Sequence, residues 1–313
     1  MYEARGKSLW GRAAALCAAI LLALTVCVRG AYAQEKTVIP LGQAVGIKLF
    51  ADGVLVVDVS ELEDGRSPAL QCGIREGDLL LTFNGEKIVS TEHLQELLRE
   101  NGDKAAQRAW IRDSMAGIGT MTYYDPESGS FGALGHGITD VDTAQLMSLG
   151  SGSIMETTVK AVKKGEKGEP GELKGDFSVQ RDVGTVTVNS DGGIFGTVSD
   201  ADFPARSQAV PVAGAEEVKP GSAVILSTVS GEEIREYQVE IVKVFRDADS
   251  TRNLLLRITD PELLQATGGI VQGMSGSPIL QNGKLVGAVT HVMINDPSQG
   301  YGIFAENMLV RAG

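Results

Sequence analysis

Short segments of strand length recur at nearly even spacing in the second half of this chain, and this rhythm most restricts its fold. Gly-rich turns separate many of these segments, which span residues 183–188, 193–198, 223–229, 236–245, 253–258 and 285–292. The chain has 39 Gly, and only 5% of its residues are aromatic. Evenly spaced short strands favour a β-sandwich or β-barrel over a helical bundle. The 313 residues suffice for two ordinary domains.

The first 33 residues have the pattern of a targeting segment. Arg5, Lys7 and Arg12 precede an uncharged run at 13–28, and the sequence AYA at 31–33 is a typical small-x-small cleavage pattern. The run is shorter than the roughly 20 residues of a free-standing membrane span. Residues 1–33 are therefore predicted to be a secretory signal peptide or an N-terminal membrane anchor. Either way, we expect an extracytoplasmic protein that contacts the membrane through this segment.

Charge and cysteine content limit the possible partners and covalent links. Residues 1–33 hold four basic residues and one acidic residue, so their removal lowers the net charge from −12 to −15. Such an acidic chain is not expected to bind nucleic acid. Cys72 is the only cysteine after residue 33, which excludes an internal disulfide in the mature chain. Its apolar neighbourhood predicts a buried structural thiol.

Two glycine-rich turns carry the residue types of nucleophilic catalysis. The sequence GMSGSP at 273–278 would expose the hydroxyl of Ser275, and GHG at 135–137 presents His136 in an equally open setting. A serine hydroxyl needs such a base near neutral pH. The backbone N–H groups of Gly273 and Ser275 are the expected oxyanion donors. The alternative is that these are plain turns, since short Gly/Ser runs usually are.

The histidine pattern argues against a metal enzyme. The chain has three histidines, and none forms an HExxH-type pair or a Cys/His cluster. We therefore expect neither a metal nor another cofactor. His291 is expected to have a structural role.

Residues 36–108 resemble a PDZ domain. The sequences GIREGDLL at 73–80 and FNG at 83–85 carry the resemblance, and LGQAVGI at 41–47 stands where PDZ domains place their carboxylate-binding loop. The resemblance implies a groove that binds an extended peptide. Its expected residues are Leu41, Gly42, Val45, Gly46 and Ile47, with His93 at the start of a helix.

Two features of this module stay open. His93 is equally compatible with a solvated helix residue. The module is also shortened at its C-terminal end, so its last strand is either missing or borrowed from residues near 106–112.

Residues 110–313 closely resemble the peptidase domain of the SpoIVB family of sporulation serine peptidases. The matching sequences are WIRDS at 110–114, AGIGT at 116–120, YDP at 124–126, GALGH at 132–136, GMSGSP at 273–278, AVTHV at 288–292, NDP at 295–297 and GYG at 300–302. The resemblance implies a mainly β chain in which a chymotrypsin-like double β-barrel follows the PDZ-like module.

The resemblance also implies a catalytic triad of His136, Asp260 and Ser275, and a functional role for Thr290. From the residues alone, the acid is undecided, because Asp140, Asp182 and Asp200 also lie between the histidine and the serine. An alternative role for Asp260 is an ordinary Asp-Pro turn.

The function implied by this resemblance is that of an exported serine endopeptidase that signals during endospore formation. The enzyme would pass from the forespore into the space between forespore and mother cell. There it would cut a membrane-bound regulator of an intramembrane protease, leading to late sigma-factor processing, and it would also cut itself. Two alternatives are a catalytically inactive PDZ adaptor and a general envelope quality-control serine protease.

Overall fold

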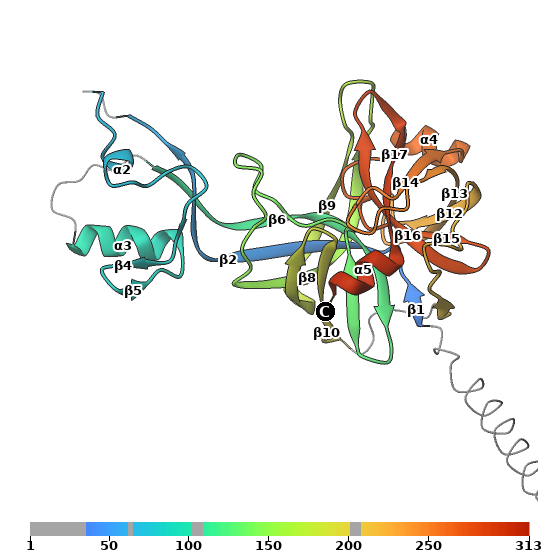
Figure 1. Ribbon diagram of the computed structural model, residues 1–313, viewed down its shortest axis with the longest axis horizontal. Coiled ribbons are helices and arrows are strands. Elements are labelled where there is room, and N and C mark those ends of the chain that lie inside the picture. The colour runs from blue at the N-terminus through green and yellow to red at the C-terminus, as the bar shows by residue number, and fades with distance from the viewer. Residues whose placement is uncertain (1–35, 62–64, 102–108, 201–207, 313) are drawn as a thin grey trace, which may run out of the picture. The chain divides into compact units, whose positions relative to one another are not determined.

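The computed structural model describes residues 36–61, 65–101, 109–200 and 208–312 (Figure 1). The mainly β prediction is confirmed, because strands form most of this part of the chain. The candidate segment at 13–28 lies outside the described residues. Within the described ranges, no helix is long and apolar enough to cross a membrane.

The first half of the fold is a nine-stranded sheet with the order β11-β1-β6-β7-β10-β9-β8-β2-β3. An additional β2–β6 pairing closes six of these strands into a ring, β6-β7-β10-β9-β8-β2, which we call the first barrel. Its strands are β2 (Ala44–Val59), β6 (Ala109–Asp125), β7 (Ser130–Ala133), β8 (Ser151–Lys163), β9 (Glu172–Ser190) and β10 (Gly193–Val198). The short strands β1 (Thr37–Pro40), β3 (Leu79–Leu80) and β11 (Val210–Pro211) extend the sheet.

The second half is a closed barrel of six strands with the order β12-β13-β14-β17-β16-β15, which we call the second barrel. These strands are β12 (Gly221–Ser227), β13 (Arg235–Val244), β14 (Leu254–Ile258), β15 (Pro278–Gln281), β16 (Lys284–Met293) and β17 (Asp296–Phe304). Helix α4 (Pro261–Thr267) follows β14, and helix α5 (Ala305–Arg311) follows β17. Two six-stranded barrels that follow one another along the chain agree with the expected chymotrypsin-like fold.

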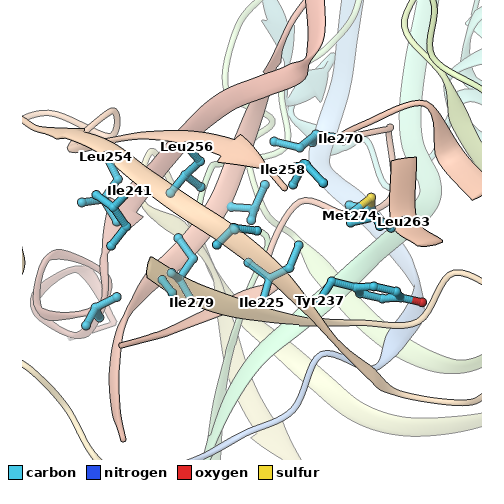
Figure 2. Packing of buried hydrophobic residues seen from close by; sticks show 14 of the residues in the cluster. Ile225, Tyr237, Ile241, Leu254, Leu256, Ile258, Leu263, Ile270, Met274 and Ile279 are labelled. Carbon is cyan, nitrogen blue, oxygen red and sulfur yellow. The ribbon is translucent and has the colours of Figure 1, made fainter. Parts of the chain in front are cut away.

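The second barrel is filled by alternate apolar side chains of its strands. Figure 2 shows Ile225, Ile241 and Leu256 packed inside it. Ile270 and Met274 join the same core, although they belong to the segment between α4 and β15. Their burial anchors that segment, which carries Ser275, to the interior of the barrel.

The small module between β2 and β6 differs from the predicted domain boundary. Strand β2 pairs with β6 in two stretches: residues 44–50 pair with 114–120 in the first barrel, and residues 55–59 pair with 109–112 in the module. The module adds α2 (Pro68–Gln71), β4 (Thr82–Phe83), β5 (Glu86–Lys87) and α3 (Thr91–Asn101) around its own core. It is therefore an insertion between two barrel strands, and residues 109–112 supply its missing last strand.

The predicted peptide groove is wrong, because its loop belongs to the first barrel. Leu41, Val45 and Ile47 are buried in the core of that barrel, and residues 45–50 also pair with β8. A Cβ at Gly46 would lie 2.6 Å from the Cβ of Phe177. The alternation that suggested a groove strand is instead that of a barrel strand with an apolar inner face.

Helix α3 holds the other predicted groove residue, His93, which does not meet residues 41–47. The Ser90 hydroxyl caps the helix by accepting from the N–H of His93 at 3.1 Å. The His93 ring accepts from the N–H of Val89 at 3.4 Å and lies 3.4 Å from the Glu86 carboxylate. These contacts are local to the small module.

The prediction that the Cys72 thiol is buried is also wrong. This residue ends the short helix α2 and is exposed. The helix has only four residues, and Ala69 is the one that it buries. The apolar neighbours of Cys72 in the sequence therefore did not predict its burial.

Candidate active site

The turn that presents Ser275 is fixed by contacts with strand β6. Gly273 and Gly276 have φ angles of +98° and +97°, in the left-handed region that favours glycine. The N–H of Thr120 donates to the carbonyl of Ser275 at 2.9 Å, and the Thr120 hydroxyl donates to the carbonyl of Gly273 at 2.8 Å. A Cβ at Gly276 would overlap the Thr120 carbonyl oxygen. The glycines thus permit a close approach that holds the turn rigidly.

The backbone N–H groups of this turn divide into two sets. Those of Met274, Gly276 and Ser277 donate to the carbonyls of Val271, Val289 and Met274. Within the described part of the chain, the N–H groups of Gly273 and Ser275 have no protein acceptor. These two are the predicted oxyanion donors, and they are free to bind a substrate oxygen.

The Ser275 hydroxyl donates to the carbonyl of Thr290 at 2.8 Å. Thr290 lies on β16, and its own hydroxyl donates to the carbonyl of Tyr301 at 3.2 Å. A Cβ at Gly135 would lie 2.9 Å from the Thr290 methyl group, so this threonine also packs beside the histidine turn. Thr290 therefore contacts both the turn that carries Ser275 and the turn that carries His136.

His136 stands on a tight turn between β7 and the following loop. Leu134 and Gly135 have φ angles of +67° and +70°. The Nδ1 atom of His136 lies 2.8 Å from the carbonyl of Gly137. A carbonyl can only accept, so Nδ1 carries the proton and Nε2 is left as the basic nitrogen. This is the tautomer that a general base requires.

A second imidazole lies beside this base. The rings of His136 and His291 have centroids 5.2 Å apart and planes tilted by 39°. Burial lowers the pKa of His136 below its ordinary value. Burial, followed by the charges of His136 and Arg252, lowers the pKa of His291 to about 4. Both rings are therefore neutral near pH 7.

One cavity of about 530 Å³ is lined by both His136 and Ser275. Its walls also include Gly273, Thr290 and His291. The structure thus brings together the expected base, nucleophile and oxyanion donors, although His136 and Ser275 are 139 positions apart in the chain. Among the described residues, no cluster of His, Cys, Asp or Glu side chains is placed to hold a metal ion.

Asp260, the expected acid, does not line this cavity. It is the N-cap of α4, where its carboxylate accepts from the N–H of Leu263 at 3.0 Å and from that of Gln238 at 3.2 Å. Among the described residues, no carboxylate forms an ion pair or hydrogen bond with the His136 ring, whose hydrogen-bond partner is the carbonyl of Gly137. The Asp-Pro turn that was the alternative for Asp260 is the local structure found.

The other candidate acids are also engaged elsewhere. Asp140 has a fully buried side chain that binds Arg112 and accepts from the N–H of Thr143 at 2.9 Å. Asp200 pairs with Arg181, and Asp182 lies in the β8–β9 ladder. In this structure the carbonyl of Gly137, and not a carboxylate, is the hydrogen-bond partner of the His136 ring.

Sequence reasoning missed three residues that shape the site. Thr120 holds the serine turn, and Asn189 holds the histidine loop by binding Ile138 and the carbonyl of Met147. His291 lies against the base, although a purely structural role was expected. The sequence offered one indirect signal for two of these residues: Thr120 and His291 lie within the sequences AGIGT and AVTHV, which carry the family resemblance.

Comparisons with known proteins agree with this geometry. The family model described as SpoIVB peptidase S55 matches residues 105–309, and a PDZ domain model matches residues 63–109. No curated protein matches the sequence.

Solved structures of the Rv3671c protease were also found. The active form from M. tuberculosis is 14% identical, covers 87% of this chain and 80% of its own, and has a TM-score of 0.39. An inactive form is 16% identical, covers 62% and 82%, and has a TM-score of 0.36.

Proposed function

Because the chain belongs to the SpoIVB peptidase S55 family and is a serine endopeptidase, we propose that it cuts a membrane-associated regulatory protein as an intercompartmental signal in endospore formation. The cut would release an intramembrane protease that matures a late sigma factor, and the enzyme would also cut itself. The observation that carries the catalytic part is the shared cavity of His136 and Ser275, next to two N–H groups without a protein acceptor.

The geometry supports the following reaction. The Ser275 hydroxyl turns from the Thr290 carbonyl toward Nε2 of His136, which takes its proton as the oxygen attacks the scissile carbonyl carbon. The N–H groups of Gly273 and Ser275 bind the resulting oxyanion, each contributing about 3 kcal/mol. His136 then protonates the leaving amine, and a water molecule hydrolyses the acyl-enzyme by the same steps.

The signalling part rests on the remainder of the chain. The targeting pattern at 1–33 would export the protein and bring it to a membrane surface. The inserted PDZ-like module offers a means of recognising a protein partner. A protease with its own recognition module is suited to one regulator rather than to many unfolded chains. The proposed location is the space between the forespore and the mother cell.

Purified protein without residues 1–33 provides the test. A fluorophosphonate probe should label the wild type, and Ser275→Ala should lose both labelling and proteolysis, with a rate loss on the order of 10⁶. Candidate membrane regulators in vesicles should be cut at discrete sites, whereas unfolded casein should persist. Rapid casein degradation would instead indicate a quality-control protease. A folded protein that neither labels nor cuts would indicate an inactive adaptor.

A further inference from the structure

The cavity beside Ser275 has walls suited to one class of substrate side chain. Besides His136, Ser275 and Gly273, its walls are formed mostly by aliphatic residues, which include Ile118, Val141, Ile270, Val271, Val292 and Ile294. We propose that this cavity binds an aliphatic side chain on the residue that contributes the scissile carbonyl, so that the enzyme selects Leu, Ile, Val or Met at that position. The inference rests on the proposed peptidase activity and specifies its substrate.

The position of the aliphatic wall relative to the oxyanion donors assigns the cavity to the substrate residue that contributes the scissile carbonyl. The segment 270–273 leads directly to the two oxyanion donors. When the scissile carbonyl oxygen binds these N–H groups, the carbonyl carbon faces the hydroxyl of Ser275. The Cα of the substrate residue that contributes this carbonyl is bonded directly to that carbon. The side chain on that Cα is accordingly assigned to the cavity that Gly273 and Ser275 border.

The lack of charged side chains in the walls argues against basic and acidic substrate side chains. Among the described residues, no Asp, Glu, Lys or Arg side chain lines the cavity. A basic substrate side chain would find no carboxylate there, and an acidic one would find no permanent cation, so either would lose its hydration without compensation. His291 is the one wall residue besides the base that could become a cation, and it is neutral near pH 7 because its pKa is lowered.

The mouth of the cavity is also apolar. Val141 and Ile294 both line it, yet 77% and 55% of their surfaces are exposed. Exposed aliphatic groups at a binding site favour an apolar ligand, because covering them removes apolar surface from water. A substrate with an aliphatic side chain would cover its own apolar surface and that of the wall together.

Diphenyl phosphonate probes that differ only in one side chain test the proposal without knowledge of the cleavage site. The Ser275 oxygen bonds to phosphorus, a phenolate leaves, and His136 passes the serine proton to it. We expect the probe with a Leu side chain to label the purified protein about 10- to 200-fold faster than matched probes with Glu or Lys side chains. The measured quantity is the second-order labelling rate at pH 7.5.

A pair of isoleucine variants locates the selectivity. Ile294→Lys should slow labelling by the Leu probe about 10-fold and narrow its advantage over the Glu probe. Ile234→Lys is the matched control, because Ile234 is also exposed but lies outside the cavity, and it should label as the wild type does. Circular dichroism and the rate with a small uncharged fluorophosphonate verify that each variant is folded and active.

Three results would overturn the inference. The first is equal labelling by the Leu, Glu and Lys probes in a protein that the fluorophosphonate labels. The second is a preference for the Glu probe that grows as the pH falls, which would indicate recognition by protonated His291. The third is an equal effect of the two lysine variants. Failure of every probe, the fluorophosphonate included, would refute the peptidase activity itself and the inference with it.

Discussion

Replacement of Asp260 separates a catalytic role from a structural one. A triad acid supports the imidazolium, so Asp260→Asn would then lower the rate by about 10⁴. In the structure, the carboxylate caps α4 and also accepts from the N–H of Gln238. We therefore expect the change to act on stability, and to lower kcat/KM of the folded protein less than about 10-fold.

The expected loss of stability follows from the two hydrogen bonds. Asparagine is itself a good N-cap, so its amide oxygen retains the bond from Leu263. Its amide N–H₂ then faces the N–H of Gln238, and the loss of that bond costs about 1–2 kcal/mol. Asp260→Ala loses both bonds and should cost about 2–3 kcal/mol. For a domain of this size, 1 kcal/mol corresponds to roughly 2–4 °C in Tm.

Thermal unfolding and fluorophosphonate labelling, measured on the same samples, distinguish the two roles. The expected result is a graded fall in Tm from wild type to Asn to Ala, with labelling rates per folded molecule nearly constant. The reasoning would be refuted by an Asp260→Asn protein with the wild-type Tm and a labelling rate reduced by several orders of magnitude. That outcome would show that Asp260 reaches the base during catalysis.

One further prediction rests on glycine packing, and two rest on histidine burial. Gly46→Ala should destabilise the first barrel by about 1–3 kcal/mol, because the new Cβ would lie 2.6 Å from the Cβ of Phe177. The control variant Gly214→Ala should change the unfolding free energy by less than about 0.5 kcal/mol. Urea unfolding measures both variants, and equal losses of stability would contradict the packing argument. Because burial lowers the pKa of His291 to about 4, the unfolded state binds more protons than the folded state between about pH 6.5 and 4, so the unfolding free energy should fall as the pH falls through that window. The lowered pKa of His136 should also place the acid limb of the labelling rate below pH 6.5, and a limb above pH 6.5 would contradict this assignment.

The strand pattern and the two glycine-rich turns could be predicted from the sequence because each depends on local chemistry. Alternating apolar residues at 236–245 specify a strand with one buried face, and the nearly continuous apolar run at 285–292 specifies a strand that is buried on both faces. Both segments form strands of the second barrel. His136 and Ser275 stand in glycine-rich turns whose backbone angles require glycine. Such signals depend on a few adjacent residues, so one sequence is enough to read them.

The acid and the cavity could not be predicted in the same way, because they depend on contacts between distant segments. The sequence at 258–261 is equally compatible with a catalytic aspartate and with a helix cap, and only the position of Gln238 and α4 distinguishes them. Similarly, Ile118 and Ile294 read as ordinary strand and turn residues. They form one wall only because β6 and the β16–β17 connection meet at the serine turn.

The misplaced peptide groove has a physical cause in the path of the chain. The motifs after residue 110 supply only five strands to the first barrel, namely β6 to β10, and a ring of six needs one more. Residues 44–50 supply it, although the small module separates them from β6 along the chain. An extended apolar segment before a PDZ-like sequence is therefore ambiguous, since it fits either sheet. The closure of the barrel decides between them, because an unpaired edge between β8 and β6 would leave the core of the first barrel open to water. A fragment that begins at residue 110 consequently lacks a strand of the first barrel, and we expect it to be unstable. Addition of residues 37–50 as a separate peptide should restore its fold. Circular dichroism would detect the restored fold, and recovery of fluorophosphonate labelling would detect the restored site.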